Sequence, residues 1–177
     1  MKALSFDDIT LIPRYNNITS RKDVDTSIKF GDMTLRIPVF SSNMDTITGS
    51  AMAHKIYELG GLGFLHRFCS IGENIELYKH SSNSRQFPYP GDDAVVSLGI
   101  NEDLERFEAL YEVGARYFCV DVAHGHSRAV GQMVTAMKKI DPKVFVVAGN
   151  VCTAEGAEYL ADKGADAADY ARARREA

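Results

Sequence analysis

The sequence has little cysteine. Three cysteines, Cys69, Cys119 and Cys152, stand far apart in the 177 residues. An odd number of widely spaced cysteines matches neither a disulfide framework nor a zinc-binding pattern. This usage favours a reducing compartment, and we expect a cytoplasmic protein.

The chain also lacks a long apolar run and a strong excess of charge of one sign. No hydrophobic segment approaches the roughly 20 residues that cross a bilayer. The N-terminal stretch MKALSFDDITL has acidic residues where a secretory signal would be apolar. A formal net charge of -4 argues against nucleic acid as the main partner. We therefore expect no membrane and no nucleic-acid partner, and the 45% hydrophobic content fits a single globular domain.

What the sequence does contain is a repeated order of apolar segment, polar loop and helix-forming segment. Strands are predicted over residues 37–41, 62–65, 94–99, 117–122 and 144–148. Helices are predicted over residues 49–59, 73–80, 102–113, 128–140 and 154–163, with N-caps at Asn101, Ser127 and Thr153 and glycine stops at Gly60, Gly114 and Gly164. Before the first unit, residues 6–13 are predicted as a short β-like segment and residues 14–27 as a polar arm. Residues 81–93 are predicted as a loop.

Two parallel α/β folds fit this order. A doubly wound sheet usually carries a glycine-rich turn after its first strand, and none follows residues 37–41. Functional-looking residues follow every predicted strand instead, as in a TIM barrel. A complete barrel needs eight units, whereas five are predicted here, and residues 167–177 (AADYARARREA) favour helix or a disordered end over a strand. We predict one partial TIM-barrel domain over residues 1–177, with an N-terminal arm at 1–30 and a divergent tail at 167–177.

The stretch YFCVDVAHGHS, residues 117–127, is the clearest candidate site. Asp121 ends an apolar strand, where a carboxylate is costly to bury unless it is paired or belongs to a site. Gly125 either permits a close backbone approach or makes an ordinary turn. His124 and His126 have no third ligand nearby, so we expect no metal.

Six motifs in order carry a family resemblance. SFDDITLIP, SRKDVDTS, SSNMDT, LHRF, VDVAHGHS and AGNV, between Phe6 and about Asp166, resemble the IMP dehydrogenase and GMP reductase family. Three features are more similar to GMP reductases: Asn43 before Met44 where IMP dehydrogenases usually have proline, the short segment after LHRF with no room for a regulatory domain, and the DTS arm with DVAHGHS. IMP dehydrogenase lineages without the regulatory insertion exist, so that alternative stays open.

The resemblance implies a TIM barrel that converts GMP to IMP and ammonia with NADPH, or uses NAD if it is IMP dehydrogenase-like. In the family a cysteine thiolate attacks C2 of the purine, ammonia leaves, and the nicotinamide supplies hydride. That cysteine lies in a loop after the sixth strand, and we expect this loop, with the family's monovalent-cation site, to be missing here. Cys152 matches the start of the fifth helix instead, so no catalytic residue is assigned.

The resemblance also implies site residues, each with a plainer alternative. The implied cofactor-binding residues are Asp121, Val122, Ala123, Arg67, Ser20 and Arg21. The implied substrate-binding residues are Ser42, Met44 and Asn150, with Asp45 beside them. The alternatives are core filling for Met44, a solvated charge for Arg67, turn geometry for Asn150 and a merely polar arm for Ser20 and Arg21.

Two hypotheses from different classes follow. The first is a GMP reductase-type oxidoreductase that binds GMP and IMP and forms the family's homo-tetramer. The second is a non-catalytic remnant that keeps part of the nucleotide surface without the nucleophile. An open partial barrel leaves sheet edges and apolar faces uncovered, which predicts association.

Overall fold

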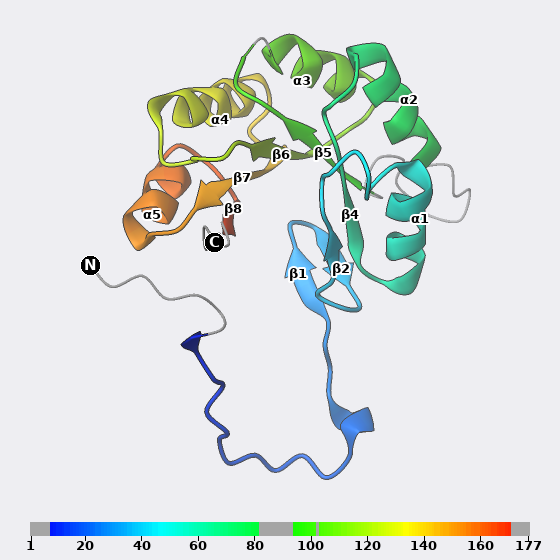
Figure 1. Cartoon of the computed structure of the whole chain (residues 1–177), viewed down its shortest axis with the longest axis vertical. Coiled ribbons are helices and arrows are strands. Elements are labelled where there is room, and N and C mark those ends of the chain that lie inside the picture. The colour runs from blue at the N-terminus through cyan, green and yellow to red at the C-terminus, as the bar shows by residue number, and fades with distance from the viewer. Residues whose placement is uncertain (1–7, 82–93, 102, 171–177) are drawn as a thin grey trace.

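The computed structural model describes residues 8–81, 94–101 and 103–170. Its centre is a curled sheet of parallel strands with helices on the outer face (Figure 1). The strands lie side by side in sequence order: β3 (Phe40–Ser41), β4 (Leu62–Leu65), β5 (Ala94–Leu98), β6 (Tyr117–Asp121), β7 (Phe145–Val151) and β8 (Ala167–Tyr170). The helices are α1 (Ser50–Leu59), α2 (Ile71–Ser81), α3 (Asp103–Glu112), α4 (Arg128–Ile140) and α5 (Ala154–Asp162). This architecture is a partial TIM barrel, which confirms the predicted fold class.

One prediction at the end of the sheet is wrong. Residues 167–170 form strand β8, although their composition favoured helix or a disordered end. The reason is tertiary: Ala167 and Ala168 pair with Val147 and Ala148 of β7. A neighbouring strand with free hydrogen-bonding groups outweighs the weak preference of alanine. The sheet therefore has a sixth parallel strand.

The N-terminal segment also differs from expectation. The described part of the β-like segment, residues 8–13, contains no strand, and the first sheet strand is only Phe40–Ser41. Two further strands, β1 (Ile28–Phe30) and β2 (Met33–Leu35), form an antiparallel hairpin that was not predicted. The predicted loop over residues 81–93 lies almost wholly outside the described residues. The other predicted strands and helices are confirmed with ends shifted by up to three residues.

The predicted helix ends rest on local chemistry. Gly60 ends α1 with a φ of 99°, a left-handed conformation that disfavours any side chain. The Ser127 hydroxyl accepts a hydrogen bond from the Val130 N–H and caps α4. Thr153 caps α5 in the same way through the Gly156 N–H. Both caps are those the sequence predicted.

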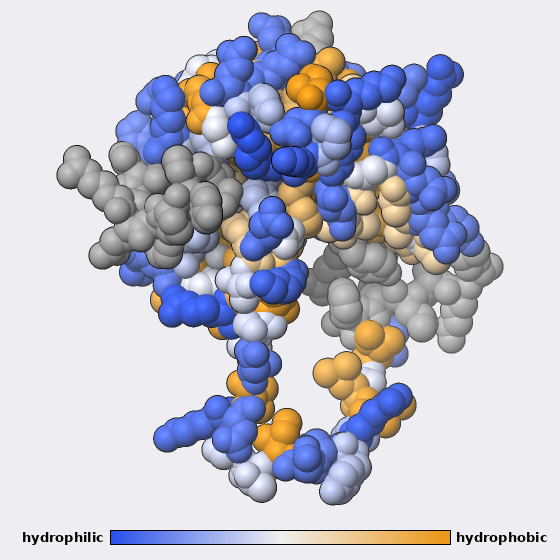
Figure 2. Space-filling view, turned by 180° about the vertical axis from the view of Figure 1, so that it is seen from behind, coloured by the Kyte–Doolittle hydropathy of each residue, from blue (hydrophilic) through white to orange (hydrophobic). Residues whose placement is uncertain are grey.

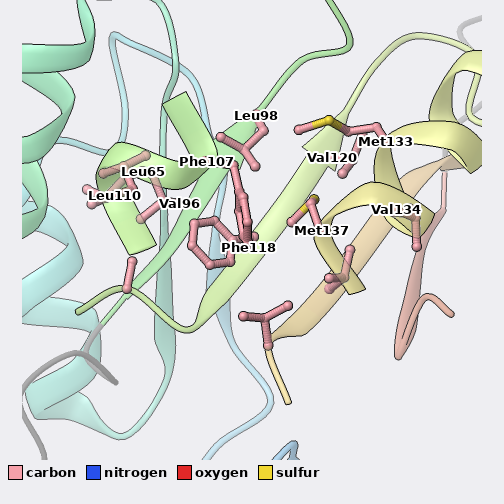
Figure 3. Close-up of a cluster of buried hydrophobic side chains, with 14 of the residues drawn as sticks. Leu65, Val96, Leu98, Phe107, Leu110, Phe118, Val120, Met133, Val134 and Met137 are labelled. Carbon is pink, nitrogen blue, oxygen red and sulfur yellow. The ribbon is translucent and has the colours of Figure 1, made fainter. Parts of the chain in front are cut away.

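The larger core lies between the sheet and the helices. Alternate strand residues point to this outer face, among them Val96, Phe118 and Val120, and all three are fully buried. Figure 3 shows them packed against side chains of α3 and α4. The Phe107 and Phe118 rings meet edge to face, with centroids 4.8 Å apart.

The inner face of the curled sheet has a smaller core. It is closed at one end by the hairpin, whose Phe30 ring lies 6.1 Å from Tyr117 and 4.6 Å from Phe145. Cys119 and Val147 lie beyond these rings on the same face. The hairpin therefore seals the end of the barrel at which the strands begin.

The rest of the N-terminal arm stands apart from this body. Residues 8–27 are exposed throughout and extend away from the sheet (Figure 1). Within this segment Arg21–Asp23 form the 3-10 helix η2, which is capped by Ser20. In Figure 2 apolar side chains alternate with polar ones along the arm. No helix of the described residues is long and apolar enough to span a bilayer.

We expect Phe118→Ala to lower the free energy of unfolding by about 3–5 kcal/mol, because it leaves a cavity in the outer core. Urea unfolding measures this change. Leu59→Ala is the control: Leu59 is 57% exposed at the end of α1, and we expect a change of about 0.5 kcal/mol or less. Equal losses in the two variants would contradict this description of the core.

Candidate functional site

The polar residues predicted as a site meet at one edge of the sheet. Parallel strands place all their carboxyl ends at the same edge. Arg67 follows β4, Asp121 ends β6, and Asn150 lies near the end of β7. The Arg67 Nη2 donates to the Asp121 carbonyl oxygen at 3.4 Å, which links loops 54 residues apart in sequence. The structure therefore brings Arg67, Asp121 and Asn150 to one edge of the sheet.

The loop after β6 is held by the backbone of β7. The Asn150 N–H donates to the Val122 carbonyl at 2.7 Å, and the Gly125 N–H donates to the Asn150 carbonyl at 2.7 Å. The Val122 N–H also donates to the Gly149 carbonyl at 3.2 Å. Val122 and Asn150, predicted for cofactor and substrate respectively, are thus joined directly. These three backbone hydrogen bonds fix the loop against β7.

Gly125 makes a close backbone approach. A Cβ at this position would lie 2.8 Å from the Gly149 carbonyl carbon and 2.9 Å from the Asn150 oxygen. Both are backbone atoms, so neither can move aside as a side chain would. Of the two interpretations left open by the sequence, the structure favours close approach over an ordinary turn.

Arg67 is not a freely solvated charge. Its side chain is half-buried, and its guanidinium lies 5.0 Å from the centre of the Phe68 ring. Its Nε is buried and has no hydrogen-bond partner among the described residues, and the same holds for Nδ1 of the neighbouring His66. Buried donors are normally paired. An unpaired Nε on an arginine at a strand end fits a site for an anionic group such as a phosphate.

The loop after β3 carries the other predicted nucleotide contacts. The Met44 carbonyl accepts hydrogen bonds from the N–H groups of Ile47 and Thr48, both at 2.9 Å. The buried Thr48 hydroxyl donates to the Ser42 carbonyl. The Met44 side chain is 50% exposed, so it does not fill the core. Ser42 and Asp45 are also exposed at this end.

A cavity of about 270 Å³ opens on the inner face beside this loop. Its walls combine aromatic side chains with polar ones, including Ser42, Asn43 and Asp169. The Asn43 Nδ2 donates to the hydroxyl of the buried Ser97 at 3.1 Å. Sequence reasoning did not assign Asn43, Ser97 or Asp169 to a site. Ser97 had one available signal, as the single polar residue in the strand AVVSL.

The cysteines differ sharply in their surroundings. Cys119 is fully buried on the inner face, and burial raises the pKa of its thiol well above the usual value. The nearby carboxylates of Asp169 and Asp121 raise this pKa further. Cys152 is exposed immediately before the N-cap of α5, at the start of the fifth helix as the family resemblance implies.

Two predicted site residues, Ser20 and Arg21, lie apart from this group. Both are exposed, and the arm that carries them extends away from the sheet (Figure 1). His124 and His126 are exposed in the loop after β6, and the His126 ring lies 5.2 Å from that of Tyr159. Within residues 8–81, 94–101 and 103–170, no three His, Cys, Asp or Glu side chains are placed to hold a metal ion.

Comparison with known proteins gives one family. Residues 3–169 match the model of the IMP dehydrogenase / GMP reductase domain. The chain is 35% identical to a GMP reductase of Streptococcus gordonii and 36% identical to one of Staphylococcus saprophyticus, covering 94% of this chain and 49% and 50% of theirs. The crystal structure of inosine 5' monophosphate dehydrogenase from Legionella pneumophila is 42% identical, with a TM-score of 0.83 over 96% of this chain and 50% of that one. The chain thus spans about half the length of these relatives.

We expect Gly125→Ala to lower the free energy of unfolding by about 1–3 kcal/mol, because the added Cβ must displace the backbone of β7. Amide hydrogen exchange at residues 122–127 should become faster. The control is Gly72→Ala, since a Cβ there meets no heavy atom within 4 Å and the position is helical. That control should be neutral or more stable by up to about 1 kcal/mol. Unchanged exchange in Gly125→Ala would contradict the close approach.

The raised pKa of Cys119 predicts a pH dependence. The folded thiol holds its proton above about pH 8.5, where an unfolded cysteine loses it. The contribution of the Cys119 thiol to the free energy of unfolding is therefore fully present below that pH. It declines as the pH rises, by at most about 1.4 kcal/mol per pH unit. Urea unfolding between pH 7 and 10 should show the decline for the unaltered chain relative to Cys119→Ala. Parallel curves for the two proteins would refute the prediction.

Proposed function

Because the chain belongs to the IMP dehydrogenase and GMP reductase family, we propose that it serves an oxidoreductase that converts GMP to IMP and ammonia with NADPH. The observation that carries the proposal is the strand-end group: Arg67, with a buried and unpaired Nε, lies against Asp121 beside the tightly held loop after β6. This is the side of the site that the family resemblance assigns to the cofactor.

The proposed roles follow from this placement. Arg67 binds a phosphate of the cofactor, since a guanidinium forms charge-assisted hydrogen bonds with phosphate oxygens. Asp121, Val122 and Ala123 contact the nicotinamide nucleotide. Ser20 and Arg21 reach the cofactor of a neighbouring subunit, because the arm stands away from its own strand ends.

The substrate side lies next to this group. Ser42, Met44 and Asn150 contact the purine nucleotide in the proposed site. Ser42 lines the inner cavity, and Asn150 holds the cofactor loop through its backbone. The two sides therefore adjoin, as hydride transfer between bound molecules requires.

The proposed reaction replaces an amino group by hydrogen. One hydride and one proton enter at C2 of the purine and its amine, and ammonia leaves. NADPH supplies the hydride when bound. We assign the nucleophile to none of the three cysteines, because burial raises the pKa of both Cys119 and Cys69, and Cys152 is exposed at the start of α5. No residue of this chain is assigned to the family's monovalent-cation site.

A second candidate is IMP dehydrogenase activity with NAD. The 42% identity to the Legionella pneumophila enzyme favours it. Asn43 favours GMP reductase instead, because IMP dehydrogenases usually have proline at this position. In the structure the Asn43 side chain bonds to Ser97 at 3.1 Å, a contact that proline cannot make.

The proposal extends to assembly and location. We propose a homo-oligomer, a tetramer as in the family, whose contacts cover the apolar residues of the arm. Ile9, Leu11, Ile12 and Tyr15 are all more than half exposed, and exposed apolar patches commonly mark interaction sites. We also propose a cytoplasmic location.

The test is to add NADPH and GMP to the purified chain and follow NADPH absorbance together with NADPH binding by calorimetry. We expect binding, and Arg67→Gln should weaken it about tenfold or more, because a charge-assisted hydrogen bond contributes about 1.5–3 kcal/mol. Lys139→Gln is the control, since Lys139 is exposed near the end of α4, on the other side of the fold.

The outcomes separate the candidates. NADPH oxidation that depends on GMP supports the reductase, whereas NADH formation from IMP and NAD supports the dehydrogenase. Binding without turnover in either assay supports a non-catalytic remnant. Absence of nucleotide binding would reject the proposed function altogether.

A further inference from the structure

The loop that carries Arg67 is held by a buried side-chain network. Residues 66–70 connect the end of β4 to the start of α2. Asn74, in the first turn of α2, is fully buried. Its Nδ2 donates to the His66 carbonyl at 3.1 Å, and its Oδ1 accepts from the Arg106 Nη1 at 3.1 Å. Both ends of this amide are therefore used.

Arg106 joins a third element to the same loop. It comes from α3, and its Nη2 donates to the Cys69 carbonyl at 2.9 Å. With Asn74 it fixes the carbonyls of His66 and Cys69, directly before and after Arg67 and Phe68. The planar guanidinium suits this task because its donors have a fixed relative geometry.

The network is not required to cap α2. The Ser70 hydroxyl already accepts from the Glu73 N–H at 3.2 Å, and a Glu73 carboxylate oxygen accepts from the Ser70 N–H at 2.8 Å. This is a complete capping box. The side chains of Asn74 and Arg106 therefore act on the loop before the helix.

We propose that Asn74 and Arg106 are positioning residues that hold Arg67 for a nucleotide phosphate. The inference rests on the proposed function. Arg67 has a long side chain, and ordering it costs rotamer entropy. Fixing the backbone on both sides of it, with Phe68 under its guanidinium at 5.0 Å, leaves less freedom to lose on binding. Arg106 contacts no nucleotide in this scheme and acts through Arg67.

The test is a double-mutant cycle between Arg106 and Arg67 with NADPH affinity as the readout. We expect Arg106→Met, which keeps most of the apolar stem, to weaken NADPH binding about tenfold. In the Arg67→Gln variant, Arg106→Met should weaken NADPH binding less than twofold. Arg106→Lys keeps the positive charge but loses the planar guanidinium, whose two nitrogens reach Asn74 and the Cys69 carbonyl. We therefore expect it to restore little of the NADPH affinity.

Arg116→Met is the matched control. Arg116 is also half-buried and donates to two backbone carbonyls, those of Tyr111 at 2.9 Å and Ala115 at 2.7 Å. It lies where β6 begins, at the opposite edge of the sheet. We expect its replacement to leave NADPH affinity unchanged. Thermal unfolding of each variant shows that binding is compared between folded proteins.

Hydrogen exchange separates failure of this inference from failure of the proposed function. Arg106→Met should speed amide exchange at residues 67–70 whether or not NADPH binds, and Arg116→Met should not. If exchange rises while the unaltered chain binds no NADPH, the proposed function fails and the positioning role falls with it. If NADPH binds and Arg106→Met weakens it equally in both Arg67 backgrounds, or not at all, the positioning role alone is overturned.

Discussion

The parallel register of β6 between its two neighbours is the constraint on which both core and site depend. β6 pairs Cys119 with Ser97 of β5 and with Val147 of β7. Side chains alternate between the faces of a strand, so this pairing sends Phe118 to the outer core and Asp121 to the inner face. A shift by one residue would exchange the faces. The same hydrogen bonds thus bury the core and place the carboxylate at the strand end.

The inner face changes in character along the strands, and this change locates the site. At the end where the strands begin, Phe30 packs against Tyr117 and Phe145. Ser97 and Asp121 lie near the other end of the inner face, where strands β5 and β6 finish. Burial of apolar surface by the hairpin stabilises the closed end, whereas polar groups at the open end remain available to a ligand.

The sequence predicted what depends on local pattern. The strand–loop–helix order, the Ser127 and Thr153 caps and the glycine stop at Gly60 are all confirmed. Strand β8 was missed because its formation depends on β7, not on its own alanine-rich composition. The hydrogen bond between Asn43 and Ser97 joins residues 54 positions apart, so no local sequence pattern predicts it. The burial of Nε in Arg67 is likewise a property of the folded chain alone.

The two loops of the candidate site are held by different means, and this decides how each responds to sequence change. Backbone hydrogen bonds from β7 hold the loop after β6, so the exposed side chains of Ala123 and His124 can vary without loss of shape, whereas Val122 also packs against the outer core. Glycine at 125 is the exception, because the bond it makes requires close approach. The loop after β4 is held by the side chains of Asn74 and Arg106, so its geometry depends on residues of two helices. Substitutions in α2 and α3 therefore reach Arg67, although neither helix supplies a predicted nucleotide contact.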